Sequence, residues 1–324
     1  TKGQEKMKWK YIAKRLLIAI PTFLGITVLA YFILNLAPGS PLDALLADPK
    51  ISPAELERKR IALGLDKPVV IQYFSWLNLL LHGDLGFSYS TQRPVAAMIG
   101  ERLPATACLA GASILLSLIV AIPLGIYAAS KPNSKRDYVS GGISLLMMAT
   151  PNFFVGLVFI YLFAIVFKIL PSGGMYDSAG VKSGAALMRH MIMPCLVLSF
   201  QQIGGWVRHM RSSMLEVMQE DYIRTARSKG LKKWGVIYKH GLKNALIPVI
   251  TVVGMSIPSL VGGAVITEQV FGWPGVGSLM VTAINGRDYP VIMGITVMIA
   301  AAVLIANILT DVAYGLLDPR ISYK

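Results

Sequence analysis

The chain has 324 residues, of which 54% are hydrophobic and only 15% are charged, and its mean hydropathy is +0.59. These values exclude an ordinary soluble protein and indicate a membrane protein with several spans. The formal net charge of +14 is compatible with nucleic-acid binding, but its distribution along the chain has another explanation, given below.

Six long runs without charged residues predict six membrane-spanning helices. They lie at about 16–36, 105–129, 139–167, 191–207, 245–267 and 291–310. The first run is too long for a signal peptide and has no clear cleavage signature, so we expect it to remain as a span. The third run is long enough to tilt or kink, and Pro151 with Asn152 supplies a site for the kink.

A loop of about 65 residues separates the first two spans. Its charged piece at 53–65 has the pattern of a helix that ends at a glycine, Gly64. A less polar piece follows at 69–81. A loop of this length usually has a structure or a function of its own. We therefore divide the chain into an N-terminal part with the first span (1–36), a loop region (37–103), a transmembrane core (104–318) and a short tail (319–324).

The basic residues gather on one side of the predicted membrane. With six spans both termini lie on the same side as segments 131–137 and 208–243, and this side carries 20 Lys and Arg and a net charge of +13. The opposite side carries 11 Lys and Arg and a net charge of +1. Since cytoplasmic segments carry the excess of Lys and Arg, we expect both termini in the cytoplasm. The membrane topology thus explains the excess of positive charge, and no nucleic-acid partner is required to explain it.

The segment between the fourth and fifth spans has the most distinctive pattern. Its first half fits a helix, because one face carries Tyr222, Thr225, Ala226 and Lys229 at helical spacing. Asp221 lies where a carboxylate favours a helix N-terminus, and Gly230 lies where a glycine ends a helix. A second amphipathic piece follows, with one side formed by Leu231, Trp234 and Tyr238. Anionic lipid requires charge but not this combination of residues, so the pattern favours a close-fitting protein partner over a lipid surface.

Motifs for catalysis are absent from the sequence. No Gly-Lys dipeptide occurs and therefore no P-loop, so any ATP that drives this protein must be hydrolysed by another chain. No G-x-S-x-G motif occurs, and the four histidines have no metal-ligand spacing. Cys108 and Cys195 lie in apolar runs, which argues against a disulfide framework and against a zinc site. We expect no catalytic residue, no metal site and no cofactor bound by this chain.

The polar groups inside the predicted spans are amides: Asn35, Asn152, Gln201, Gln202 and Asn307. No span has a charged residue near its middle, which argues against a proton relay. Two interpretations of the amides stay open, since they can bond between helices or line a path for a solute. Asn152, Gln201 and Gln202 are our preferred candidates for the path.

The segment Asp221–Pro248 resembles the inner-membrane permease subunits of binding-protein-dependent ABC importers. The similarity lies in the run DYIRTARSKGL followed by His240, Asn244 and Pro248, and it is strongest to the dipeptide, oligopeptide and nickel permeases. Arg224 stands where the wider superfamily has Glu, and Pro248 comes later than usual; both departures are shared by the peptide subgroup. Further matches run almost end to end: LAPGSP (36–41), LGLDKP (63–68), GDLGFSY (83–89), RLPAT (102–106), EQVFGWPGVG (268–277), RDYP (287–290) and LLDPR (316–320).

The resemblance implies an all-α integral membrane protein with six transmembrane helices in the type I ABC importer permease fold. It corresponds to the first permease of a pair, which has a long external loop after helix 1 and a cytoplasmic coupling helix between helices 4 and 5. The implied partners are a homologous second permease, two cytoplasmic ATPases that hold ATP and Mg²⁺, and an external solute-binding protein. The implied location is the cytoplasmic membrane of a bacterium or archaeon, with multiple passes.

The same resemblance implies roles for individual residues. A coupling segment at 215–244 would dock on an ATPase through Asp221, Tyr222, Arg224, Thr225, Ala226, Arg227 and Gly230. In it, Tyr222 and Ala226 would form the contact face, two arginines the polar rim, and Gly230 the break after the helix. Residues at the external mouth would include Trp273, Pro274, Arg287 and Asp288.

The solute is expected to be a peptide, which is the commonest solute of the family. Nickel or a metal chelate, an opine and an oligosaccharide stay open as alternatives. A self-sufficient secondary transporter or channel is the alternative of another class; it would need no docking helix and would usually have a charged intramembrane site.

Overall fold

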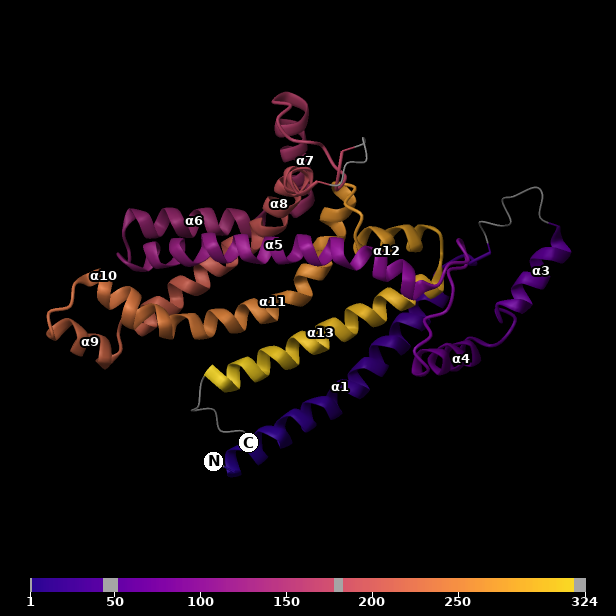
Figure 1. Cartoon of the computed structure of the whole chain (residues 1–324), viewed down its shortest axis with the longest axis horizontal. Coiled ribbons are helices and arrows are strands. Elements are labelled where there is room, and N and C mark those ends of the chain that lie inside the picture. Colours follow the sequence, from indigo (N-terminus) through magenta and orange to yellow (C-terminus); the bar gives the residue numbers. More distant parts are fainter. Residues whose placement is uncertain (1, 43–51, 178–182, 318–324) are drawn as a thin grey trace. The chain divides into compact units, whose positions relative to one another are not determined.

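The computed structural model, drawn in Figure 1, describes residues 2–42, 52–177 and 183–317. By its internal contacts the chain divides into two compact units. The first unit contains residues 1–104 and 275–304, and the second contains 105–274 and 305–324. Helices form nearly all the regular structure of the described residues, beside one isolated antiparallel bridge between Phe87 and Pro94. This agrees with the predicted all-α class.

Within the described residues, the first unit contains six helices or parts of helices. It contains α1 (Lys2–Leu36), α3 (Pro53–Ala62), α4 (Val69–Leu81), the start of α5 (Val95–Ala129), α12 (Val276–Asn285) and the start of α13 (Tyr289–Leu317). Ser52 begins α3 because its Oγ accepts the backbone N–H of Glu55 at 3.2 Å. Gly64, with φ +68°, ends this helix close to the predicted position, and α4 has the bounds of the less polar piece.

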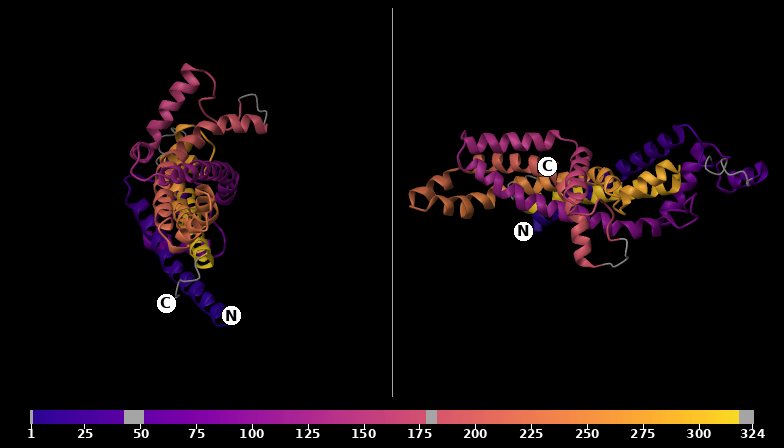
Figure 2. Two further views of the ribbon diagram at one scale, coloured as in Figure 1. Left: turned by 90° about the vertical axis from the view of Figure 1, so that its left-hand side faces the viewer. Right: turned by 90° about the horizontal axis from the view of Figure 1, so that it is seen from above.

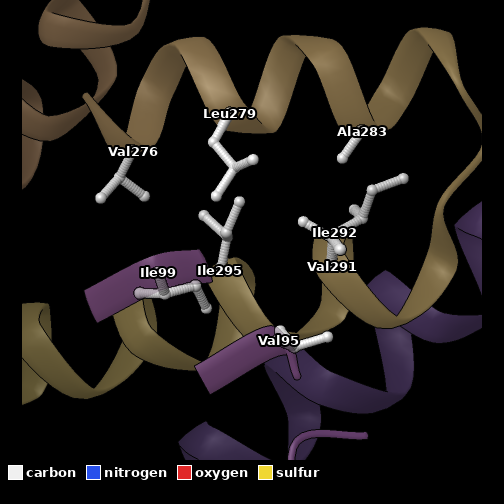
Figure 3. Close-up of a cluster of buried hydrophobic side chains, with 8 residues drawn as sticks. All are labelled: Val95, Ile99, Val276, Leu279, Ala283, Val291, Ile292 and Ile295. Carbon is white, nitrogen blue, oxygen red and sulfur yellow. The ribbon is translucent and has the colours of Figure 1, made fainter. Parts of the chain in front are cut away.

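A cluster of branched side chains forms the core of the first unit (Figure 3). Short helix α12 covers the two longer helices, and the cluster consists of Val95 and Ile99 from α5, Val276, Leu279 and Ala283 from α12, and Val291, Ile292 and Ile295 from α13. A Cβ on Gly294 would lie 2.6 Å from the Val95 Cγ1, so glycine allows α13 to approach α5 closely.

An aromatic cluster attaches the loop region to the first helix. The ring of Tyr31 on α1 lies 5.4 Å from the ring of Tyr73 and 6.0 Å from that of Trp76, both on α4. The hydroxyl groups of Thr27 and Tyr73 are hydrogen-bonded at 3.0 Å. The loop region is therefore held to α1 by buried contacts.

The second unit contains the remaining helices, in which α8 packs against both α6 and α11 (Figure 2). Its elements, besides the ends of α5 and α13, are α6 (Lys135–Ala149), α7 (Asn152–Phe159), η1 (Ile160–Val166), α8 (Gly184–Val217), α9 (Asp221–Ser228), α10 (Lys233–Gly235), η2 (Val236–Leu242) and α11 (Lys243–Val270). The π-helical turns η1 and η2 each extend a preceding α-helix.

The third predicted span is broken at the predicted site. Helix α6 ends at Ala149 and α7 begins at Asn152, and the axis bends by 96° between them. Pro151 cannot continue the backbone hydrogen bonds of α6. The carbonyl of Thr150 instead accepts a hydrogen bond from Nε2 of Gln201 on α8 at 3.0 Å, so one of the two predicted path glutamines stabilises the break.

Helices long and apolar enough to cross a membrane include Leu17–Leu36, Val95–Ala129 and Tyr289–Thr310, and the bent pair α6 and α7–η1 is a further candidate. The predicted fourth and fifth spans lie within α8 and α11, which have 34 and 28 residues. Helix α5 begins at Val95, ten residues before the predicted start at 105. The helix is longer than the predicted span because Glu101 and Arg102 interrupt the apolar run without interrupting the helix; Glu101 pairs with Arg93.

Replacement of Gly204 by valine is expected to destabilise the second unit. A Cβ at this position of α8 would lie 2.6 Å from the Ser144 carbonyl oxygen of α6, so the two helices would have to separate. Such overpacking costs about 1–3 kcal/mol and should lower the melting temperature of the purified protein by several degrees. Gly205→Val is the matched control, because a Cβ on Gly205 would meet nothing within 4 Å. Equal melting temperatures of the two variants would contradict the prediction.

Candidate functional site

Segment 215–244 connects α8 to α11 as two short helical pieces with a turn between them. Helix α9 (Asp221–Ser228) follows the end of α8, the chain turns at Gly230 with φ +77°, and α10 with η2 leads into α11. In Figure 1, α9 and α10 lie together at one end of the long helices α8 and α11. The helix and the glycine break after it agree with the sequence pattern.

One face of α9 is buried within the chain itself. Ile223 is 0% exposed and Ala226 is 5% exposed, and both pack with Val236 of η2 and with Met218. Residues three apart share a face of a helix, so the same rotation that buries Ile223 also buries Ala226. The expectation that Ala226 forms a contact face for a partner is therefore wrong, since its small side chain allows α9 to pack on η2. The branched apolar side chain of Ile223 was the signal that our sequence analysis missed.

The opposite face of α9 is exposed and polar: it carries Asp221, Tyr222, Arg224, Thr225 and Arg227. Asp221 and Arg224 form an exposed ion pair at 3.7 Å, which contributes little to stability. The Thr225 hydroxyl donates to the carbonyl of Asp221 at 3.0 Å, within the helix. This face has no covering element among the described residues, and Gly230 is exposed as well.

A hydrogen bond ties the exposed face of α9 to the start of α11. Nδ2 of Asn244 donates to the hydroxyl of Tyr222 at 2.8 Å, and the Tyr222 side chain remains half-exposed. A second bond holds the other half of the segment, since Nζ of Lys233 donates to the carbonyl of Ser130 after α5 at 3.0 Å. The segment is thus connected to α5 and α11, both of which extend into predicted spans.

An exposed aromatic pair extends this surface. The rings of Trp234 and Tyr238 are stacked with their centroids 5.6 Å apart, and both side chains are exposed, as is Leu231. The predicted apolar side of the second piece is therefore not covered by the described part of this chain. Exposed stacked aromatics beside lysines are suited to contact with another protein or with a membrane surface.

The three amides predicted to line a path have different environments. Gln201 is bonded to Thr150 at the break, and Nε2 of Gln202 contacts its own helix at the Leu198 carbonyl, at 3.4 Å. Oδ1 of Asn152 and Oε1 of Gln202 are buried and have no donor among the described residues. These two buried oxygens thus lack a hydrogen bond in the described structure, whereas Gln201 has a structural partner.

Trp273 does not lie at a surface, contrary to expectation. Its side chain is 0% exposed and its indole N–H donates to the carbonyl of Ala105 at 2.9 Å. Glu268, five residues earlier, is also buried and accepts the hydroxyl of Thr106 at 2.6 Å. The segment 268–274 therefore packs against the adjoining part of α5, and Pro274 beside it is half-buried. A surface role for Trp273 was wrong because a distant helix covers it.

Asp288 is likewise buried and hydrogen-bonded within the chain, contrary to its predicted place at the external mouth. Its carboxylate is 2% exposed and accepts four hydrogen bonds. The donors are the Ser88 hydroxyl at 2.5 Å, the Ser90 hydroxyl at 2.7 Å, and the backbone N–H groups of Tyr89 at 3.0 Å and Ser90 at 3.3 Å. Arg287, with φ +52°, places its guanidinium where a Cβ on Gly39 would lie. Three motifs that are far apart in sequence, 36–41, 83–89 and 287–290, thus meet within the first unit.

The arrangement is suited to docking and to mechanical connection. Among the described residues, no group of three or more His, Cys, Asp or Glu side chains is placed to hold a metal ion. Segment 215–244 has an exposed polar helix, α9, whose other face is packed against apolar side chains. Hydrogen bonds join the segment to α11 and to the residue that follows α5. A partner that moves α9 would therefore pull on α11.

Two family descriptions match successive parts of the chain. "Binding-protein-dependent transport system inner membrane component" matches residues 121–323, and the N-terminal component of the same kind of transport system matches residues 8–110. Oligopeptide transport system permease protein AppB of Bacillus subtilis is 43% identical over 314 residues, which cover 97% of this chain and 99% of that protein. Dipeptide transport system permease protein DppB of Escherichia coli is 36% identical over 336 residues, which cover 97% and 99%.

A solved structure has a similar fold. A chain from the inward-facing MetNI methionine ABC transporter superposes with a TM-score of 0.57, covering 69% of this chain and 97% of that chain. The sequence identity is 15%, so this likeness concerns the fold alone.

Proposed function

Because the chain belongs to the family of binding-protein-dependent transport system inner membrane components, we propose that it forms half of a path by which peptides cross a membrane. It is a permease subunit of an ABC importer with the type I permease fold, and ATP is hydrolysed by a partner ATPase and not by this chain. The observation that carries the proposal is the near full-length similarity to two permeases whose names specify peptides.

Peptides are the best supported class of solute. The two relatives are named for oligopeptides and for dipeptides, at 43% and 36% identity. Nickel or a metal chelate, an opine or an oligosaccharide has no comparable support among the relatives described above. The path residues that we propose are Asn152, Gln201 and Gln202, because their amides are uncharged polar groups within the predicted spans.

The partners that we propose are a homologous second permease, two cytoplasmic ATPases with ATP and Mg²⁺, and an external solute-binding protein. The chain is a multi-pass protein of the inner membrane. The excess of Lys and Arg on the side of both termini and of segment 215–244 supports a cytoplasmic position for all three. The loop region 37–103 would then face the solute-binding protein.

In this proposal α9 is the helix that docks on an ATPase. Its exposed face offers Tyr222, Arg224 and Arg227, and Gly230 separates it from the piece that leads into α11. Closure of the ATPases on ATP would move α9 as a unit, because its buried face is packed on Val236. The bond between Asn244 and Tyr222 would carry this movement to α11.

The test of the function is ATPase activity of the assembled transporter. The chain is co-expressed with its neighbouring transport genes, and ATP hydrolysis is measured in membranes with and without the solute-binding protein and a pool of mixed peptides. We expect stimulation that requires both additions. Stimulation by the binding protein without any effect of peptides would overturn the solute class, and full uptake by the chain without an ATPase would support a secondary transporter instead.

Tyr222→Phe is expected to reduce peptide-stimulated ATPase activity about threefold, because it removes one hydrogen bond worth about 0.5–1.5 kcal/mol. Asn244→Leu should have a similar effect, and the double variant should lose little more, since both changes remove the same bond. Tyr138→Phe on α6 is the control, because its exposed hydroxyl has no hydrogen bond among the described residues and it lies outside segment 215–244. Additive losses in the double variant would contradict the role of this bond.

A further inference from the structure

A cavity in the first unit has no role in the function proposed so far. Its volume is about 460 Å³, and it lies between the end of α3, the exposed side of α4, the turn at 84–89 and the start of α13. This volume falls in the range of sites for small molecules. All the residues that line it belong to the first unit, and none belongs to segment 215–244.

Aromatic side chains form much of the cavity wall. They are Tyr31, Trp76, Phe87, Tyr89 and Tyr289. The rings of Tyr31 and Trp76 lie 6.0 Å apart within the cluster that joins α1 to α4, so this part of the wall is already formed in the absence of a ligand. Phe87 is 55% exposed and therefore lies where a ligand can reach it. Such a wall suits a large apolar side chain, since aromatic rings supply contact area at a small entropic cost.

Two exposed charges of opposite sign also line the cavity. Lys67 and Asp84 have no ion-pair partner within the part of the chain that the structure describes. One carboxylate oxygen of Asp84 accepts the N–H of Gly86 at 2.8 Å, and the other has no such bond among the described residues. Burial, followed by the nearby Asp288 carboxylate, raises the pKa of Tyr89 to about 12, so this phenol stays neutral and can donate at physiological pH.

We propose that this cavity is an accessory binding site for a short peptide with free ends and a large apolar side chain. The side chain would pack on the aromatic wall, the peptide carboxylate would pair with Lys67, and the peptide ammonium would pair with Asp84. The two charges of opposite sign match the free carboxylate and the free ammonium of a short peptide, and a loop of the solute-binding protein as the occupant is an outcome that the test below distinguishes. This inference rests on the proposed function, because it concerns the same class of solute.

The test measures binding of the tripeptide Ala-Phe-Ala by calorimetry to the purified transporter without its solute-binding protein. We expect Phe87→Ser and Lys67→Gln each to weaken the Kd at least tenfold. Matched controls are Phe74→Ser, an equally exposed phenylalanine of α4, and Arg58→Gln, an exposed cation of α3; neither lines the cavity, and neither should change the Kd. Amidation of the peptide carboxylate should weaken binding to the parent chain tenfold and have no further effect in Lys67→Gln.

Three outcomes would overturn the site. They are no binding by the parent chain, equal Kd values in all variants, and variants that weaken association with the solute-binding protein but not with the peptide. Uptake of Ala-Phe-Ala with ATP and the solute-binding protein, measured on the same samples, separates this failure from that of the proposed function. If the transporter takes up Ala-Phe-Ala but the variants have the same Kd as the parent chain, only the accessory site is rejected. If the transporter takes up no peptide, the proposal that peptides are the solute is rejected.

Discussion

Gly230→Leu is expected to reduce peptide-stimulated ATPase activity and uptake at least tenfold while the transporter still assembles. Gly230 has φ +77°, a conformation that costs an L-residue about 1–2 kcal/mol. A Cβ there would meet nothing within 4 Å, so the effect arises from the backbone and not from a clash. Because 1.4 kcal/mol corresponds to a factor of ten, relaxation of this turn is sufficient to turn α9 away from its partner in most molecules.

Two variants separate backbone strain from the loss of glycine itself. Asn tolerates the left-handed conformation, so Gly230→Asn should retain most of the activity. Gly235→Leu places the same side chain in α10, where φ is −61° and where a Cβ would also meet nothing within 4 Å. This variant should have the same peptide-stimulated ATPase activity and uptake as the parent chain. Uptake and ATPase activity of folded Gly230→Leu equal to those of the parent would show that the break does not serve coupling.

Asp288→Ala is expected to destabilise the first unit by at least about 3 kcal/mol, because even one hydrogen bond to a charged group contributes about 1.5–3 kcal/mol. The substitution would leave two serine hydroxyls and two backbone N–H groups without their acceptor. The turn that carries GDLGFSY would then detach from the start of α13. The measurement is thermal unfolding of the purified protein, combined with limited proteolysis of the loop region 37–103.

Asp66→Ala is the control for this change, since Asp66 is an exposed carboxylate of the same unit with no hydrogen bond among the described residues. It should leave the melting temperature unchanged. Asp288→Asn keeps the shape and one acceptor oxygen, so its loss of stability should lie between the two. If Asp288→Ala melted at the temperature of Asp66→Ala, Asp288 would be no anchor, and a role at the external mouth would regain support.

Several local features of this protein were predictable from its sequence. The glycine at 230 has the positive φ that its position after a helix pattern implied, and the break at Pro151 lies where proline removes a backbone donor. Five of the six apolar runs lie within long helices, and the third is divided at Pro151, because a backbone in lipid must satisfy its own hydrogen bonds. The motifs identified the family, since their order and spacing are properties of the sequence itself.

The direction in which a side chain points was decided only by the tertiary structure. Helical spacing placed Ala226 on a face of α9, but the packing of η2 made that face the inner one. Trp273 and Asp288 looked like surface residues in a loop until α5 and the turn at 88–90 covered them. The hydrogen bond from Gln201 to the carbonyl of Thr150 likewise joins residues 51 positions apart in the sequence. Periodicity reports which residues share a face, whereas burial depends on segments far away in the sequence, and local patterns carry no information about those.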